Sequence, residues 1–240
     1  MASKPRFFVK SLIGDLVNLD QSESHHLMTV LRLNIGDAVT LFDGTGNVKL
    51  ARISHFDGKN AHLKIKGTLP CNESPIKITV ALAVPRAQKM SFVIAKLTEL
   101  GVATIKPLLV DHSAVTETYI NSRINRWESI GVAAAKQCGR GVAPHISRAQ
   151  TLEESLADTT TNNRLLMNPG ARNLQANVKI STSVNTWIGP EGGWSKRELE
   201  IARTHSVITF GLGPRIFRIE TAAICSVTIL QWIAGDLNTS

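Results

Sequence analysis

Short apolar runs alternate with turn-forming residues over the first part of the chain. The runs occupy residues 38–42, 48–53 and 61–65, and Asp-Gly turns stand at 43–44 and 57–58. Apolar, β-branched runs of this length predict strands, and Asp-Gly pairs between such runs are typical of hairpins. The pattern therefore predicts a small antiparallel barrel or sheet over residues 1–70.

One helical pattern lies ahead of these hairpins. Residues 22–33 place Leu27, Val30 and Leu31 at the spacing of a single helix face. Apolar residues three and four positions apart indicate an amphipathic helix. We predict one helix here, ending at Arg32.

A different pattern begins after the polar, breaker-rich segment 67–75, where we place a domain boundary between residues 1–70 and 71–240. Strand-like and helix-like runs then alternate, which predicts a largely parallel sheet covered by helices. The expected strands are 76–84, 103–110, 165–167, 184–188 and 207–210, and the expected helices are 90–100, 122–138 and 221–233. Two more helices should begin after Thr151 and Ser195, because a glutamate three residues later completes a capping box. Trp127 lies in the apolar stripe of its helix and is expected in the core.

Charge and composition narrow the function. The 240 residues include 27 Lys and Arg against 19 Asp and Glu, a formal charge of +8 that favours a polyanionic partner such as nucleic acid. Residues 1–10 lack the apolar core of a signal peptide, and the apolar stretch 222–234 is too short to span a bilayer, so we expect a cytoplasmic protein. The cysteines at 71, 138 and 225 are too widely spaced to predict a zinc site or a disulfide framework, and no metal is expected.

Two glycine-bearing segments near the carboxyl end carry the strongest functional signal. Residues 187–194 and 210–222 each follow a buried-strand pattern, and 168–170 is a third junction of the same kind. Loops at the carboxyl ends of strands are where α/β proteins bind small ligands. The segment 189–196 lacks the glycine that precedes the lysine of a P-loop, and Ile216 stands where a dinucleotide fingerprint needs a small residue. These mismatches argue against an ATPase and against a nicotinamide enzyme.

The sequence also contains no G-x-S-x-G elbow, and no Ser, Cys or His stands out as a nucleophile. We therefore expect direct transfer between two bound substrates, without a covalent enzyme intermediate.

Residues 188–193 and 212–222, taken together and in this order, resemble the RsmE type of 16S ribosomal RNA methyltransferase, in the SPOUT superfamily. Residues 92–102, 137–140 and Pro144 also look like that family, and residues 6–8 and 25–32 look like its amino-terminal domain. The chain departs from the family pattern at Ile219, Lys136 and 85–90. The first departure affects a pocket contact, and the others affect surface and RNA contacts.

The resemblance implies an α/β fold: a carboxyl-terminal SPOUT domain with a deep trefoil knot and a mostly parallel sheet, preceded by a small PUA-like β-barrel. It also implies a homodimer that methylates the N3 atom of a uridine in 16S rRNA, as naked RNA or in the assembled small ribosomal subunit. The implied cofactor is S-adenosylmethionine. Two alternatives stay open: a SPOUT enzyme acting on another nucleotide or on ribose, and a PUA-like RNA-binding protein without activity.

The resemblance also assigns residues. The expected cofactor contacts are Leu166, Asn168, Ile188, Gly189, Pro190, Glu191, Gly192, Gly193, Gly211, Leu212, Gly213, Ile216, Phe217, Arg218 and Thr221. Within this set, Leu166, Ile188, Leu212 and Ile216 are expected to hold the adenine.

Three charged residues are expected near the reacting atoms. Arg218 suits the negative charge that spreads over the uracil carbonyls, because it is a permanently charged, planar donor. Glu220 and Glu191 are both candidates for receiving the proton or for orienting Arg218. The candidates for RNA phosphates are Arg6, Arg32, Arg86, Lys89 and Arg140.

Overall fold

The computed structural model describes residues 4–71, 73–85, 89–113, 115–174, 179–180 and 182–238. The chain divides into two compact units. The first comprises residues 1–73 and 132–143, and the second comprises residues 74–131 and 144–240. The segment 132–143 is thus far in sequence from the rest of the first unit.

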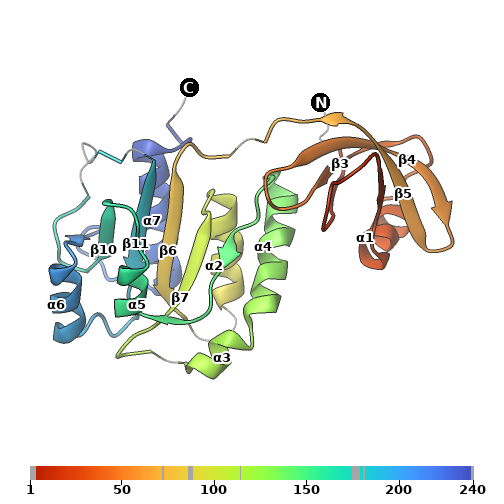
Figure 1. The fold of residues 1–240 in the computed structure, drawn as a ribbon. Helices are drawn as coiled ribbons and strands as arrows, with labels where there is room; N and C mark the ends of the chain where they lie inside the picture. Colours follow the sequence, from red (N-terminus) through yellow and green to blue (C-terminus); the bar gives the residue numbers. More distant parts are fainter. Residues whose placement is uncertain are drawn as a thin grey trace. The chain divides into compact units, whose positions relative to one another are not determined.

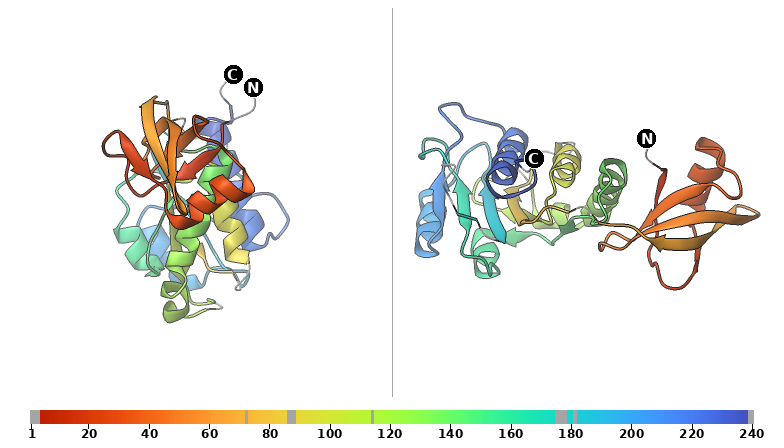
Figure 2. Two further views of the ribbon diagram at one scale, coloured as in Figure 1. Left: turned by 90° about the vertical axis from the view of Figure 1, so that its right-hand side faces the viewer. Right: turned by 90° about the horizontal axis from the view of Figure 1, so that it is seen from above.

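The first unit is built on a five-stranded sheet that curls into a partial barrel (Figure 2). Its strands are β1 (Arg6–Phe8), β2 (Leu16–Asn18), β3 (Ala38–Phe42), β4 (Val48–Asp57) and β5 (Asn60–Thr68), in the order β1-β3-β4-β5-β2. The β3-β4-β5-β2 pairs are antiparallel, as predicted, whereas β1 runs parallel to β3. Phe7, Val39, Leu41 and Leu63 fill the core of this unit.

The predicted helix at 22–33 is wrong in extent and in its apolar face. The structure has a short helix α1 (Gln21–His25) that continues as a π-helix η1 (His26–Val30). Its wider turn is marked by the bond from the Leu31 amide to the His26 carbonyl, five residues back. Leu27 is buried, but Val30 is 60% exposed. The wider turn changes which residues face the sheet, so the spacing of an ordinary helix does not identify them.

The second unit is built on a seven-stranded sheet in which all the pairs are parallel. Its strands are β6 (Lys77–Ala83), β7 (Thr104–Leu109), β8 (His145–Ile146), β9 (Gln150–Thr151), β10 (Arg164–Met167), β11 (Ser183–Ile188) and β12 (Ile208–Phe210). The order is β12-β10-β11-β6-β7-β8, and β9 pairs with β7. These findings confirm the predicted α/β class and the mostly parallel sheet. The trefoil knot stays a prediction.

Helices cover both faces of this sheet, with α2 (Lys89–Glu99) and α7 (Ile219–Ala234) on one face and α5 (Leu152–Ala157) and α6 (Lys196–Thr204) on the other (Figures 1 and 2). Two more helices are α3 (Glu117–Asn121) and α4 (Ile124–Cys138), so the helix predicted at 122–138 begins two residues later than expected. Both predicted capping boxes are present, at Thr151 and at Ser195.

Large apolar side chains join the layers of the second unit. Trp127 is buried, as predicted, and Trp187 lies fully buried in the sheet. The indole nitrogen of Trp187 donates to the Ser155 hydroxyl of α5 at 3.0 Å. A buried indole needs such a partner for its N–H group. The rigid core fixes the strand ends from which the loops project.

Candidate cofactor site at the strand ends

The carboxyl ends of four neighbouring strands, β12, β10, β11 and β6, lie along one edge of the parallel sheet. Met167, the last residue of β10, is in register with the last residues of β11 and β12, Ile188 and Phe210. On the far side of β11, Ile188 pairs with Leu82 of β6. The three loops singled out by sequence therefore start side by side, which confirms that they meet at one edge.

The loop after β11 is shaped by a tryptophan. The indole nitrogen of Trp194 donates to the Met167 carbonyl at 2.9 Å, which ties this loop to the end of β10. A Cβ added at Gly189 would lie 2.8 Å from the indole, so a side chain here would displace the Trp194 ring. The Gly193 amide donates to the Pro190 carbonyl at 2.9 Å and closes a tight turn.

The loops after β10 and β12 are bonded to each other. The Gly211 amide donates to the Arg172 carbonyl at 2.8 Å, and the Gly213 amide donates to the Asn173 side-chain oxygen at 2.8 Å. A Cβ at Gly211 would overlap the carbonyl oxygen of Ala171. Glycine is needed here so that two backbone segments can approach.

These two loops border a cavity of about 310 Å³. Its lining is mostly apolar and comes from the loops and from α7: Asn173, Leu174, Gly211, Leu212, Gly213, Phe217, Cys225 and Ile229. The volume is at the lower end of the range for small-ligand pockets. Four of the predicted cofactor residues, Gly211, Leu212, Gly213 and Phe217, are among those that line it.

The apolar side chains predicted to hold the adenine do not share one environment. Leu166 and Ile188 are fully buried in the sheet core. Ile216 is 80% exposed, and Leu212 lines the cavity. A ligand at this edge therefore meets the backbone ends of β10 and β11, while side-chain contact is available from Leu212 and its neighbours.

The three charged candidates differ in their surroundings. Glu191 and Arg218 are exposed, and Arg218 is the N-cap residue of α7, without a side-chain capping bond. Glu220, in the first turn of α7, forms an ion pair with Lys89 at 2.8 Å. Burial opposes ionisation of Glu220, but the hydrogen bond and charge of Lys89, together with the charge of Arg218, hold its pKa below the ordinary value. Glu220 is therefore an ionised, positioned carboxylate.

The loop after β7 brings residues to this edge that the sequence reasoning did not select. The carboxylate of Asp111 accepts from the Ser195 hydroxyl at 2.6 Å, which lowers the pKa of Asp111. The Asp111 amide donates to the buried carboxylate of Glu198 at 2.9 Å. Next to it, Nδ1 of His112 lies 3.0 Å from the carbonyl oxygen of Gly193. The available signal was the strand pattern of β7, because these residues follow its carboxyl end.

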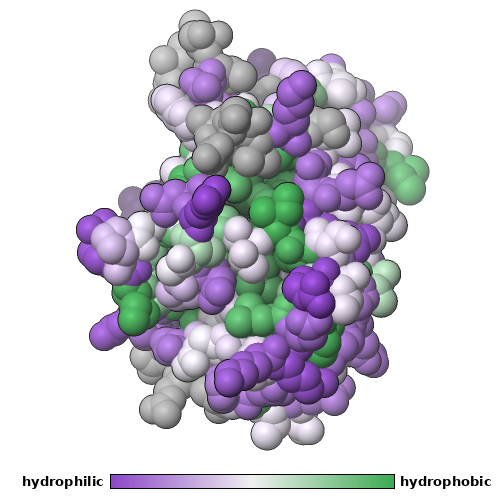
Figure 3. All heavy atoms as spheres, turned by 90° about the vertical axis from the view of Figure 1, so that its left-hand side faces the viewer, coloured by the Kyte–Doolittle hydropathy of each residue, from purple (hydrophilic) through white to green (hydrophobic). Residues whose placement is uncertain are grey.

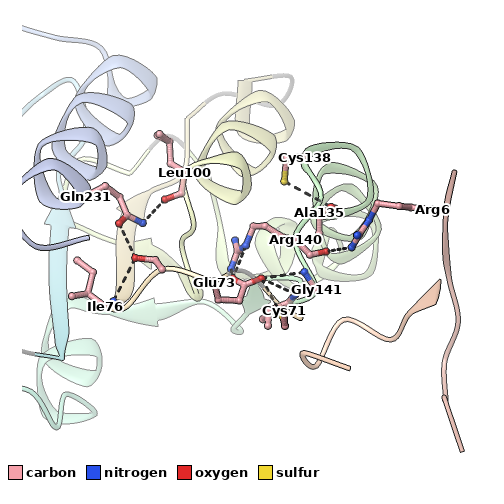
Figure 4. Close-up of polar contacts among 12 residues, drawn as sticks. Arg6, Cys71, Glu73, Ile76, Leu100, Ala135, Cys138, Arg140, Gly141 and Gln231 are labelled. Atoms are coloured by element: carbon pink, nitrogen blue, oxygen red, sulfur yellow. Dashed lines mark hydrogen bonds and ion pairs between the residues drawn. The ribbon is translucent and has the colours of Figure 1, made fainter. Parts of the chain in front are cut away.

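The predicted RNA contacts are spread over both units, and Arg86 lies outside the described residues. Arg32 is exposed, and Lys89 is the partner of Glu220. Arg140 donates two bonds to the Glu73 carboxylate, and its side chain is only 8% exposed (Figure 4). Arg6 donates to the Arg140 carbonyl at 2.6 Å and lies over the Phe42 ring.

Two further expectations concern metals and membranes. Within the described residues, no group of three or more His, Cys, Asp and Glu residues is arranged to hold a metal ion. Across the same residues, no helix has the length and apolar character needed to cross a bilayer. All three cysteines are free thiols.

Two family models of known proteins match the chain, one in its amino-terminal part and one in the remainder. Residues 72–231 match the family model of an RNA methyltransferase domain, and residues 19–66 match that of an RNA methyltransferase PUA domain. Ribosomal RNA small subunit methyltransferase E of Buchnera aphidicola subsp. Schizaphis graminum is 30% identical, and the match covers 98% of each chain. The Bacillus subtilis protein of the same name is 26% identical over 88% of this chain and 87% of its own.

Solved structures give the same result. A ribosomal RNA small subunit methyltransferase E from Neisseria gonorrhoeae bound to S-adenosyl methionine is 30% identical, with a TM-score of 0.90 over 98% of this chain and 99% of its own. A methyltransferase from Legionella pneumophila in complex with the same cofactor is also 30% identical, with a TM-score of 0.87 over 98% of this chain and 100% of its own.

Proposed function

Because the chain belongs to the RNA methyltransferase family that includes ribosomal RNA small subunit methyltransferase E, we propose that it methylates N3 of one uridine in 16S rRNA. The methyl donor in this proposal is S-adenosylmethionine, which the two similar crystal structures contain. The observation that carries the proposal is the alignment of three glycine-bearing loops at the ends of β10, β11 and β12.

The cofactor fits the chemistry of this edge. Phe217, Leu212 and Leu174 offer apolar walls for an adenine, and the loops offer backbone groups for its polar edge. We assign the cofactor to this cavity and to the adjoining loop of Gly189, Pro190, Glu191, Gly192 and Gly193. When bound, S-adenosylmethionine supplies an electrophilic methyl group, and the residues of the chain align the acceptor with it.

Arg218 is proposed to stabilise the reacting base. Loss of the N3 proton leaves negative charge on the uracil carbonyls, and an exposed guanidinium beside the loops can donate two parallel hydrogen bonds to it. We expect Arg218→Ala to slow single-turnover methyl transfer by about a hundredfold, as the loss of one oxyanion donor does. Cofactor affinity, measured in parallel by calorimetry, separates this effect from the loss of a cofactor contact by Arg218. The matched variant is Arg218→Lys, which keeps the charge but loses the two parallel donors of the guanidinium. Full methyl transfer by Arg218→Ala would refute the proposed role of Arg218.

RNA binding is proposed to involve the amino-terminal unit. Arg32 is exposed and Arg6 is half-buried, so these two are the first to test as phosphate contacts. If both bind phosphates, Arg6→Ala with Arg32→Ala should weaken RNA binding and reduce the slope of log affinity against log salt by about 2. An unchanged slope would remove both from the contact set.

We also propose a cytoplasmic homodimer. Apolar side chains gather in the middle of the face drawn in Figure 3, among hydrophilic ones. Exposed large apolar residues of the second unit include Ile208, Ile216 and Trp232. Apolar surface that is exposed on a monomer often marks an interaction site. Light scattering at several concentrations measures the oligomeric state directly.

The decisive experiment is transfer of a radioactive methyl group to 16S rRNA and to assembled small subunits, followed by nucleoside mapping. The proposal predicts N3-methyluridine at one position. Another methylated nucleoside would identify a SPOUT enzyme of different specificity. RNA binding without any methyl transfer would identify an inactive RNA-binding protein.

A further inference from the structure

His112 lies next to the loops that we assign to the cofactor, and one of its ring nitrogens already makes a hydrogen bond. Its Nδ1 lies 3.0 Å from the Gly193 carbonyl oxygen. A carbonyl oxygen can only accept, so Nδ1 carries a hydrogen and donates it. In the neutral ring this leaves a lone pair on Nε2, because the bond made by one nitrogen fixes the state of the other. The residue is exposed, and Nε2 has no hydrogen-bond partner among the described residues.

The adjoining loop is built to accept this imidazole. A Cβ added at Gly192 would lie 3.3 Å from Cβ of His112, tighter than nine in ten real Cβ contacts, and 3.4 Å from its Nδ1. Glycine at this position thus lets the ring pack against the loop that we assign to the cofactor. The ring is held by its hydrogen bond to the Gly193 carbonyl, and the lack of a side chain at Gly192 leaves room for it.

The charged groups around His112 belong to three segments. Asp111 precedes it in its own loop and contributes a nearby negative charge. From α6, Arg197 lies 3.4 Å from Asp111, and Glu198 accepts from the Asp111 amide. Glu191 belongs to the same loop as Gly192 and is exposed. The Asp111 carboxylate thus contacts Ser195 and Arg197. Nε2 of His112 points away from the hydrogen bond that Nδ1 makes.

We propose that His112 accepts the proton of the methylated base, an inference that rests on the proposed function. In this step Nε2 takes the proton from uridine N3, and the electron pair left on N3 forms the bond to the methyl carbon. The pair of the broken carbon–sulfur bond stays on sulfur. The products are S-adenosylhomocysteine, N3-methyluridine and an imidazolium ring that returns its proton to solvent.

Chemistry favours His112 over the two carboxylates. A general base works best when its pKa lies near the working pH, and imidazoles exchange protons near neutrality. Glu220 is held ionised by Lys89, with a lowered pKa, so it is a weak acceptor for the proton of a weakly acidic N–H group. Glu191 belongs to the loop that we assign to the cofactor.

The test separates proton transfer from loop support. His112→Asn keeps an N–H donor near the position of Nδ1 but lacks the basic nitrogen, whereas His112→Ala lacks both. We expect His112→Asn to bind S-adenosylmethionine within about twofold of the original chain, whereas any loss of binding in His112→Ala alone measures loop support. Both should lose roughly a hundredfold or more in single-turnover rate, the range attributed to general bases. The pH profile of the rate should differ from that of the original chain in both variants, and added imidazole should partly restore His112→Ala.

A matched control is His205→Asn. Nδ1 of His205 also lies 3.0 Å from a carbonyl oxygen, that of Ile201, but His205 caps the end of α6 and precedes β12. This variant should retain the original rate and pH profile. A normal rate in His112→Asn would overturn the proposal, as would a slow rate with the original pH profile. If the unsubstituted chain binds the cofactor yet methylates no RNA at any pH, the proposed function itself fails.

Discussion

The loops at 189–193 and 211–213 look alike in sequence, but their glycines are required by different neighbours. At Gly189 the space for a Cβ is taken by the Trp194 indole, a side chain that can shift. At Gly211 it is taken by the carbonyl oxygen of Ala171, which is part of a backbone that is itself bonded to the loop. One glycine therefore permits side-chain packing, and the other permits two backbone segments to meet.

The comparison predicts the largest effect for Gly211→Ala. The new methyl group must displace the 171–173 backbone, which breaks the bonds that close the cavity. We expect a loss of about 1–3 kcal/mol in the free energy of unfolding, the usual cost of overpacking. Cofactor affinity should fall roughly tenfold or more, which corresponds to at least about 1.4 kcal/mol.

Chemical denaturation and calorimetric titration measure the two quantities for Gly211→Ala. The matched control is Gly67→Ala in β5, where an added Cβ meets nothing within 4 Å. If Gly211→Ala equals this control in both stability and affinity, the backbone approach does not hold the cavity closed, and the distinction between the loops is lost.

A smaller effect is expected for Gly189→Ala. The indole of Trp194 can tilt away, at the cost of its hydrogen bond to the Met167 carbonyl, which is worth about 1 kcal/mol. Trp194→Phe removes the same bond without adding a methyl group, so it should destabilise by about 0.5–1.5 kcal/mol. Denaturant unfolding of both variants and of the double variant measures their coupling. If the two effects simply add, the indole is not what excludes a side chain at Gly189.

The sequence predicted which strand ends carry the glycine-bearing loops. It did not predict which residues from elsewhere in the chain pack against those loops. Apolar strands that end in glycine-bearing loops can be recognised from the local sequence pattern. The ends of β10, β11 and β12 do align in the structure. The approach of Ala171 to Gly211 depends on the pairing of β10 with β12, which are far apart in the sequence, and that of His112 to Gly192 depends on where β7 ends. A local pattern does not contain such long-range approaches.

The same limit explains what was missed in the amino-terminal unit. Arg140 and Glu73 are 67 residues apart and form an ion pair in which Arg140 is buried. The Glu73 carboxylate also accepts from the Gly141 and Val142 amides at 3.1 Å. Composition alone marks such an arginine as a surface charge. Similarly, the apolar spacing at 22–33 did not reveal the π-helical turn that leaves Val30 exposed.

The loops also differ in the carboxylates that accompany them, and this difference predicts a pH effect. Glu191 in the first loop is exposed, whereas Glu220 after the second is paired with Lys89. The folded-state pKa of Glu220 is below its ordinary value of 4.5, so the pair stabilises the fold above about that pH. This stabilisation is lost as the pH falls through the lower, folded-state pKa.

Lys89→Met should therefore lower the free energy of unfolding at pH 7 by about 1 kcal/mol or less, since Lys89 is partly exposed and screened. The gap from the original chain should close as the pH falls below about 4.5, the ordinary pKa of Glu220, and through its lower folded-state pKa. Denaturant unfolding at several pH values measures it, with Glu191→Gln as the control that changes little. A gap independent of pH would mean that Lys89 contributes through packing of its alkyl chain, and that the carboxylates of the two loops differ in exposure alone.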